Sequence, residues 1–266
     1  MQSASPQYVG VDWASGAWVA VSYADRDADP DVSVFDSIRA VWEAYGESSE
    51  RIVVDVPIGL HGSGDVDDSP SREADEEISR TCDDIARDVV GDQYRSVFTA
   101  PARDAAELAA DETTPYADVT ARNEDLTGKG LSRQAANISP AITAVDSLLV
   151  NNGDPAVLVE GHPEVCVRAF NGESLTHSKH TAAGVDERLS AIEDVPEYTD
   201  SDWRTLARSL AEDAQSVALD DLLDALVLAL TACADESELR RLPTDPPEDA
   251  QGLPMQMVYR SETELD

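Results

Sequence analysis

Lysine is almost missing from this chain. Its 266 residues include 19 basic ones, of which only Lys129 and Lys179 are lysines, against 54 Asp and Glu. The resulting formal net charge of -35 makes a compact chain repel itself in dilute buffer. At about 1 M ionic strength the Debye length falls to ~3 Å, so these like charges are screened from one another. We therefore expect a halophilic protein. The same screening means that net charge neither excludes nor supports a nucleic-acid partner.

Cysteines and long apolar runs are also scarce. Cys82, Cys166 and Cys233 lie far apart and form no CxxC pair, which argues against a disulfide framework or a Cys-based zinc site and favours a reducing compartment. The longest apolar stretch, which begins at Ala225, is too short to cross a bilayer. Residues 1–6 show no basic segment leading into an apolar run, so no signal peptide is expected. We expect a cytoplasmic protein without a membrane partner. The sequence indicates no particular oligomeric state.

Regular segments run through most of the chain, and an apolar content of 42% argues against a disordered acidic regulator. Alternating or continuous apolar runs predict five strands, at residues 8–12, 17–23, 32–35, 51–56 and 155–160. Helical spacing of apolar residues predicts helices at about 37–45, 72–90, 101–111, 115–126, 134–150, 163–170, 185–193, 202–213 and 216–234. Residues 57–71 are rich in Gly, Asp and Pro and are expected to form a loop.

The order of these elements is that of the ribonuclease H-like fold. We expect one α/β domain over residues 1–266, with a central mixed five-stranded sheet whose first three strands are antiparallel and which helices flank. The stretch at about 72–150 is then a helical insertion between strands 4 and 5. Residues 235–266, which contain four prolines, form a C-terminal extension expected to wrap the surface.

Three acidic positions stand apart from the general acidity. Asp12 and Asp55 each end an apolar strand, and Asp224 interrupts a leucine-rich helix. Asp221 and Asp220 lie three and four residues before Asp224 and share a helical face with it, so the helix acid that faces a site stays open. In the expected fold these acids meet, and clustered carboxylates suit Mg²⁺ or Mn²⁺ in a metal-assisted phosphodiester hydrolysis. The plainer interpretation is that each acid caps a loop or helix.

A second polar segment follows the fifth predicted strand. Glu160 or Glu164 is a candidate for adding or orienting a metal ligand, and His162 for carrying a proton, although a helix-capping and turn role explains His162, Pro163 and Glu164 equally well. His177 and His180 form only a weak pattern for a transition metal. Lys179 and Lys129 are candidates for phosphate contact, since a lysine is a compact point charge.

Several segments together resemble the predicted RNase H-like nuclease family catalogued as domain of unknown function 429, and the charge suggests a haloarchaeal-type member. The resemblance covers roughly residues 8 to 234. The segments that carry it are Gly10-Val11-Asp12, Val54 to Leu60, Arg80 to Arg87, Ser96 to Arg103, Gly128 to Ser132 with Gln134, Glu160 to Glu164, Ser178-Lys179 with Gly184 and Arg188, and Asp220 to Ala225. The chain departs from the family at Trp13 to Ala17, where members often carry a Gly-Cys-Lys-like turn.

The resemblance implies an RNase H-like fold and metal-dependent nuclease chemistry, with Asp12, Asp55 and Asp224 as the acids. We therefore expect a nuclease that uses Mg²⁺ or Mn²⁺ held by Asp12, Asp55, Asp224 and Asp221, with Glu160 and Lys179 as further catalytic residues. Whether the nucleic acid is DNA or RNA is open. Two alternatives remain: a non-catalytic binding module with the same fold, and a nucleotide-dependent phosphotransferase. The 14 glycines and single expected lobe disfavour the second.

Overall fold

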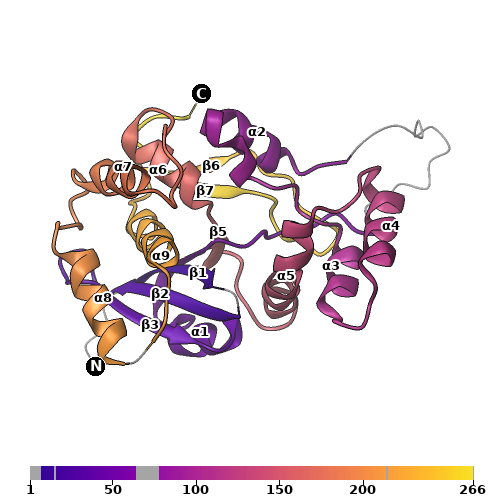
Figure 1. Cartoon of the computed structure of the whole chain (residues 1–266), viewed down its shortest axis with the longest axis horizontal. Helices are drawn as coiled ribbons and strands as arrows, with labels where there is room; N and C mark the ends of the chain where they lie inside the picture. The colour runs from indigo at the N-terminus through magenta and orange to yellow at the C-terminus, as the bar shows by residue number, and fades with distance from the viewer. Residues whose placement is uncertain (1–6, 15, 64–77, 214, 266) are drawn as a thin grey trace.

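The centre of the protein is a five-stranded mixed sheet, seen in a computed structural model that describes residues 7–14, 16–63, 78–213 and 215–265 (Figure 1). Its strands are β1 (Gln7–Ala14), β2 (Ala17–Tyr23), β3 (Asp31–Phe35), β4 (Ser49–Val54) and β5 (Leu158–Glu160), in the order β3-β2-β1-β4-β5. β1 pairs antiparallel with β2 and β2 with β3, whereas β4 pairs parallel with β1 and with β5. The expected mixed α/β architecture with a five-stranded sheet is confirmed.

Helices flank the sheet and fill the interval between β4 and β5. They are α1 (Ile38–Tyr45), α2 (Thr81–Val90), the 3-10 helix η1 (Gly91–Ser96), α3 (Arg103–Ala110), α4 (Tyr116–Thr127), α5 (Arg133–Asn151), α6 (Pro163–Asn171), α7 (Ala182–Ile192), α8 (Asp202–Glu212) and α9 (Leu219–Ala232). Of the helix expected at 72–90, residues 72–77 lie outside the described residues and the helix begins at Thr81. In the described part of the chain, no helix combines the length and apolarity needed to cross a membrane.

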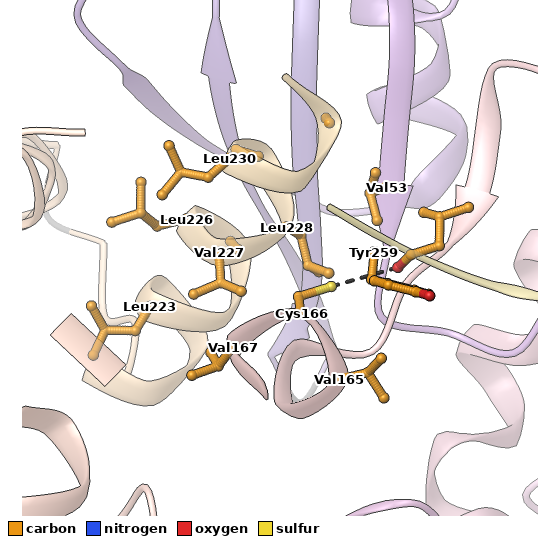
Figure 2. Close-up of a cluster of buried hydrophobic side chains, with 14 of the residues drawn as sticks. Val53, Val165, Cys166, Val167, Leu223, Leu226, Val227, Leu228, Leu230 and Tyr259 are labelled. Atoms are coloured by element: carbon orange, nitrogen blue, oxygen red, sulfur yellow. Dashed lines mark hydrogen bonds between the residues drawn. The ribbon is translucent and has the colours of Figure 1, made fainter. Parts of the chain in front are cut away.

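Strand alternation divides the apolar core between the two faces of the sheet. In β4, Ile52 and Val54 pack into one core with α1 and α5, whereas Val53 between them packs into the other core with α9. Figure 2 shows Val53 on the α9 side, near Leu228 and Cys166. Both faces of β4 are therefore buried, which explains its nearly continuous apolar sequence.

A glycine sets how closely α9 lies on β1. A Cβ atom at Gly10 would stand 2.1 Å from both the backbone oxygen of Ala225 and the backbone nitrogen of Ala229, closer than non-bonded atoms approach. Only glycine therefore permits this contact between helix and strand backbones. Asp12 is the next β1 residue on the same face as Gly10, so its carboxylate is directed toward the helix that carries Asp224.

The C-terminal segment differs from the expectation that it wraps the surface. It forms a second, two-stranded antiparallel sheet from β6 (Leu239–Leu242) and β7 (Met257–Arg260). Met257, Val258 and Tyr259 are buried in the α9 core, and Val258 makes a parallel bridge to Gly161 directly after β5. Each of these strands has only four residues and lies near prolines, so its alternation of apolar and polar residues is too short to predict a strand from the sequence.

Candidate functional site

A pocket of about 400 Å³ opens where the sheet, α9 and the segments before α6 and α7 meet. Its charged lining consists of Asp55, Arg95, Glu164, Lys179 and Asp224, together with His162 and His180. Asp12 does not line it. η1 and the start of α5, from the interval between β4 and β5, close the other side. The site therefore joins the sheet to segments far apart in the sequence.

Strand register aligns the first two acids. Gly10 pairs with Val53 and Val11 with Val54, and the backbone N–H of Asp55 donates to the carbonyl of Val11 at 3.0 Å. Asp55 therefore continues β4 beside Asp12, and the period of two turns both side chains toward the α9 face. The sequence predicted that both acids end their strands, but β1 continues to Ala14, so Asp12 lies within β1 whereas Asp55 follows the end of β4.

Asp12 carries the least compensated charge of the site. It is only 6% exposed, and no hydrogen bond or ion pair joins its carboxylate to another described residue. Burial raises the pKa of Asp12 well above its ordinary value, and the charges of Asp224, Asp55 and Asp221 raise it further, while Lys179 opposes them. The pKa of Asp55 is also raised, first by burial, with His162 and Lys179 opposing the rise.

Lys179 is the counter-charge within the pocket. Its Nζ lies 2.5 Å from Oδ2 of Asp224, which is 3% exposed. Burial raises the pKa of Asp224 to about 6, although the ion pair with Lys179 restrains that rise. Burial lowers the pKa of Lys179, but Asp224, Asp55 and Asp12 outweigh it, so the net pKa is raised and the ammonium keeps its charge.

The structure distinguishes the three acids of α9. Asp224 lines the pocket, whereas Asp220 is directed to the imidazole of His180, with Nδ1 and Oδ2 3.2 Å apart. Asp221 is half-buried, and burial followed by the neighbouring Asp220 raises its pKa. It adds to the negative field at Asp12 but does not line the pocket.

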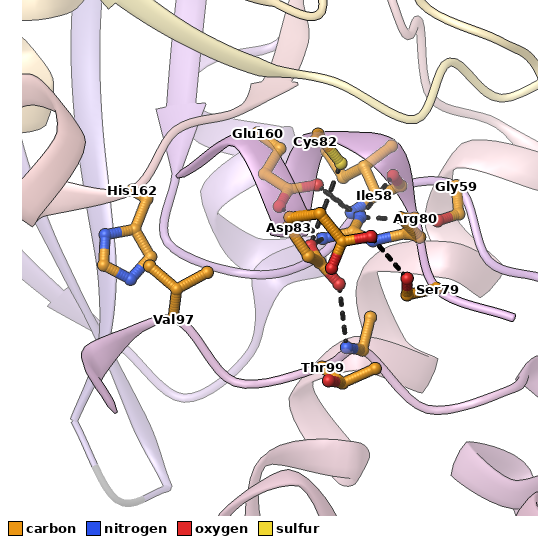
Figure 3. Close-up of polar contacts among 12 residues, drawn as sticks. Ile58, Gly59, Ser79, Arg80, Cys82, Asp83, Val97, Thr99, Glu160 and His162 are labelled. Carbon is orange, nitrogen blue, oxygen red and sulfur yellow. Dashed lines mark hydrogen bonds and ion pairs between the residues drawn. The ribbon is translucent and has the colours of Figure 1, made fainter. Parts of the chain in front are cut away.

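Glu160 does not lie with the other candidate acids at the pocket. Its register partner in β4 is Val54, which packs on the face opposite α9, so alternation turns Glu160 to that face as well. There Arg80 donates to both carboxylate oxygens, at 2.7 and 2.8 Å, and the N–H of Ile58 donates to Oε2 at 2.7 Å. Arg80 also pairs with Asp83 (Figure 3). Glu160 thus belongs to a buried ion-pair network that anchors the start of α2.

Other pocket residues were singled out only weakly, or not at all, from the sequence. Oε1 of Glu164 accepts from Arg188, while its buried Oε2 has no hydrogen-bond partner in the described part of the chain. His162 caps α6, because its Nδ1 accepts from the N–H of Glu164 at 3.2 Å. Arg95, from η1, reaches the pocket through an exposed turn with no sequence pattern that would have revealed it.

Pre-formed metal clusters are absent from the ranges that the structure describes, in which no group of three or more His, Cys, Asp and Glu residues is arranged to hold an ion. The weak His177 and His180 pattern does not assemble, because His177 pairs with Glu187 at 3.0 Å and His180 with Asp220. Lys179 supplies the positive charge near the carboxylates instead.

Comparison with known proteins identifies one family. The family described as "Protein of unknown function (DUF429)" matches residues 10–248, which extend from β1 through α9 into the segment between β6 and β7. No curated protein and no solved structure matches the chain.

Proposed function

The chain belongs to the DUF429 family of proteins of unknown function, and we propose that it is a divalent-metal-dependent nuclease with an RNase H-like fold. The observation that carries the proposal is that Asp55 and Asp224 line one pocket with Lys179, and that the buried Asp12 lies near enough for both acids to raise its pKa. The three acids come from two neighbouring parallel strands and the helix that crosses them. Acids from separated elements, with raised pKa values in a concave site, mark a candidate functional site.

The fold supports the same proposal. The sheet order β3-β2-β1-β4-β5, with an antiparallel meander first and two parallel strands after it, is the arrangement expected of an RNase H-like domain. The last long helix, α9, packs against β1 as that fold requires. Because a fold alone does not determine a function, the carboxylate pocket has to carry the chemistry.

The donor set fits Mg²⁺ or Mn²⁺ by its chemistry. Asp12 and Asp55 offer carboxylate oxygens that accept no hydrogen bond from any described residue, and Asp224 offers a third group. Mg²⁺ is usually held by one or two carboxylates together with substrate phosphate and water, so the two carboxylates that line the pocket are enough to bind it. Asp12, Asp55 and Asp224 would hold the ion, with Asp221 adding negative charge nearby. When bound, such an ion polarises a phosphate oxygen and lowers the pKa of water.

The chain's own residues supply the remaining chemistry. Lys179 presents an ammonium with three donors, and it is placed to bind a phosphate oxygen while neutralising the acids around it. His162 lines the pocket and has the side chain suited to accept or release a proton there. Glu164 lines the pocket, pairs with Arg188 through Oε1, and has a buried Oε2 that accepts no hydrogen bond from the described residues. The proposed substrate is therefore a nucleic-acid phosphodiester, either DNA or RNA.

Cleavage assays test this proposal. Fluorescent DNA and RNA, single-stranded and duplex, are incubated with the protein in about 1 M KCl, where surface charges are screened, with Mg²⁺, Mn²⁺ or EDTA. We expect cleavage only with a divalent ion. Asp55→Asn should lower the rate by about 100-fold or more, the scale of removing one group that stabilises transition-state charge. Asp88→Asn, which removes an exposed acid of α2, is the matched control.

Calorimetric titration with Mn²⁺ separates the alternatives. Binding that Asp55→Asn abolishes, accompanied by cleavage, supports the nuclease. Metal binding without cleavage of any substrate favours the non-catalytic module. A protein that binds no Mn²⁺ and cleaves nothing is not a metal-dependent nuclease.

A further inference from the structure

A second groove, of about 390 Å³, continues the carboxylate pocket. One wall is η1 and the residues after it, including Tyr94, Arg95 and Phe98, and the other is the turn between α4 and α5 with the start of α5. Arg95, Phe98 and Gln134 line both the groove and the carboxylate pocket. A flexible polymer lying in the groove would therefore pass directly into the pocket.

The groove differs in charge from the rest of the molecule. Asp and Glu make up 54 of the 266 residues, yet none of the described residues that line the groove is acidic. Arg87, Arg95 and Lys129 line it instead, and Lys129 is one of only two lysines in the chain. Arg87 forms an ion pair with Asp84, whereas no ion pair joins Arg95 to an acid in the described ranges. A groove whose described lining holds cations and no acid suits a polyanion.

Two aromatic rings accompany these cations. Tyr94 is 48% exposed, and Phe98 is half-buried beside it in the lining. The guanidinium of Arg95 lies over the Tyr94 ring, 5.6 Å from its centroid, and its Nε donates to the Tyr94 hydroxyl at 3.1 Å. Aromatic rings interleaved with cations are the combination that binds single-stranded nucleic acid, because unpaired bases stack on the rings while cations contact phosphates.

The opposite wall is held rigidly by buried side chains. Asn123 donates to the carbonyl of Lys129 at 2.8 Å and accepts from the N–H of Ala102 at 2.8 Å. The hydroxyl of Thr127 accepts from the N–H of Lys129 at 3.2 Å. Asn123 and Thr127 are both almost fully buried, so this turn is ordered before any ligand arrives. A pre-ordered wall lowers the entropy cost of binding.

We propose that this groove binds a short single-stranded segment of nucleic acid next to the phosphate held in the carboxylate pocket. Tyr94 and Phe98 stack with bases, and Arg95 and Lys129 contact phosphates. The proposal rests on the proposed function, because it takes the pocket as the place where the strand is cut. A duplex, whose bases are already stacked, cannot use the rings in this way.

Fluorescence anisotropy in EDTA tests binding without cleavage. The probes are labelled oligothymidylate and oligouridylate of about 12 nucleotides, within the ~4–16 nucleotides that such sites cover, and a duplex of the same length. We expect both single strands to bind more tightly than the duplex. Tyr94→Ala should weaken single-strand binding by about five-fold or more, the lower end for loss of one stacked base. Arg95→Gln should also weaken it, and should reduce the slope of log affinity against log salt by about 0.7.

Matched variants control for fold and for general charge. Tyr94→Phe keeps the ring and should bind as the unmodified protein does. Arg241→Gln removes an exposed arginine of β6, outside the groove, and should also leave affinity unchanged. Circular dichroism at each salt concentration establishes that every variant is folded.

The results separate this inference from the proposed function. Equal binding by Tyr94→Ala, Arg95→Gln and the unmodified protein overturns the groove assignment even where metal-dependent cleavage is observed. Binding that these two variants lose, in a protein that cleaves nothing, supports the groove and defeats the nuclease. Preference for the duplex, or no binding of either single strand, overturns the groove assignment.

Discussion

At the residue level, the protein has two groups of buried charges on opposite faces of the sheet. The groups differ in how many of their carboxylates accept hydrogen bonds. Around Arg80, every carboxylate has a hydrogen-bond donor, and Glu160 and Asp83 share the guanidinium. Asp12 and Asp55, by contrast, accept no hydrogen bond in the described part of the chain and have Lys179 nearby as a cation. A buried charge without partners costs stability, and such a cost is commonly retained where binding or catalysis requires it.

Replacing Asp12 with Asn should therefore stabilise the metal-free protein. Burial and neighbouring acids raise the pKa of Asp12 above its unfolded value, so the wild-type protein loses stability as the pH rises from about 4. We expect Asp12→Asn to raise the free energy of unfolding by about 1 kcal/mol at neutral pH, and the difference to vanish at low pH, where Asp12 is protonated. Urea unfolding in EDTA across this pH range measures the effect. A loss of stability at every pH would contradict it.

Replacing Arg80 should have the opposite effect on stability from replacing Asp12. Removing one partner of a buried ion pair leaves an uncompensated charge, so Arg80→Met should lower the free energy of unfolding by about 3–5 kcal/mol. Burial already raises the pKa of Glu160 to about 7 against the pull of Arg80, and without Arg80 it would rise further. Because a raised acid pKa removes stability as the pH rises above the unfolded value of about 4.5, the loss should be larger at pH 8 than at pH 5.

The exposed pair of Arg39 and Glu43 is the control for this substitution. Arg39 is 77% exposed and Glu43 65% in their side chains. Arg39→Met should cost less than about 1 kcal/mol and show little change with pH. If the two arginine variants lose equal free energy of unfolding in urea, burial of the Arg80 ion pair does not account for its contribution to stability.

At the level of elements, the site depends on how α9 crosses β1. Gly10 lets the two backbones touch, and this contact sets Asp224 beside Asp12. The leucines and valines of α9 then bury one side of the helix against the sheet and the other against α6 and β7 (Figure 2). Because the helix is packed on both sides, it has no room to move away from an added methyl group.

Gly10→Ala should accordingly be far more harmful than a typical glycine substitution. The added Cβ meets backbone atoms rather than a flexible side chain, so α9 must shift, and we expect a loss of about 3 kcal/mol or more. Gly130→Ala is the control, because its Cβ would meet only a side-chain methyl of Thr120, at 3.2 Å. Denaturant unfolding of both variants compares them. A small loss for Gly10→Ala would mean that α9 is less tightly held against β1 than the structure indicates.

For the whole molecule, charge of one sign governs the conditions of folding. A net charge of -35 over 266 residues destabilises the compact state through self-repulsion, and salt screens this repulsion. Arginine supplies 17 of the 19 basic residues, and several arginines are committed to buried ion pairs, among them Arg80, Arg188 and Arg260. These short-range pairs survive at high salt, whereas surface repulsion does not.

We therefore expect folding to depend on salt. At about 50 mM salt, where the Debye length exceeds 10 Å, circular dichroism should show loss of helical signal, and return to molar KCl should restore it. Titration with KCl monitored by circular dichroism gives the midpoint. A control series in sucrose separates screening of charge from general exclusion of solute, because sucrose stabilises burial without screening. A protein that keeps its full signal at low salt would not be a halophilic one.

Local sequence patterns were enough to predict most of the helices and strands. The apolar runs of β1, β2 and β4 and the leucine spacing of α9 follow from side-chain periodicity, which depends only on neighbouring residues. The same patterns singled out Asp12, Asp55 and Asp224, because an acid at the end of an apolar strand or within a leucine-rich helix is locally unusual. Their convergence was expected from the order of the elements alone.

Contacts between distant segments were decided only by the tertiary structure. Asp224 rather than Asp220 faces the pocket because of how α9 lies on β1, where Gly10 permits a backbone contact between residues more than 200 positions apart. Glu160 points away from the pocket because its pairing with Val54 in β4 determines which face of the sheet it lies on. β5 has only three residues, too few for an alternating pattern that would predict this from the sequence. The groove beside Tyr94 arises where η1 meets the turn before α5. Local propensity carries no information on such pairings, because they exist only once the intervening chain has packed.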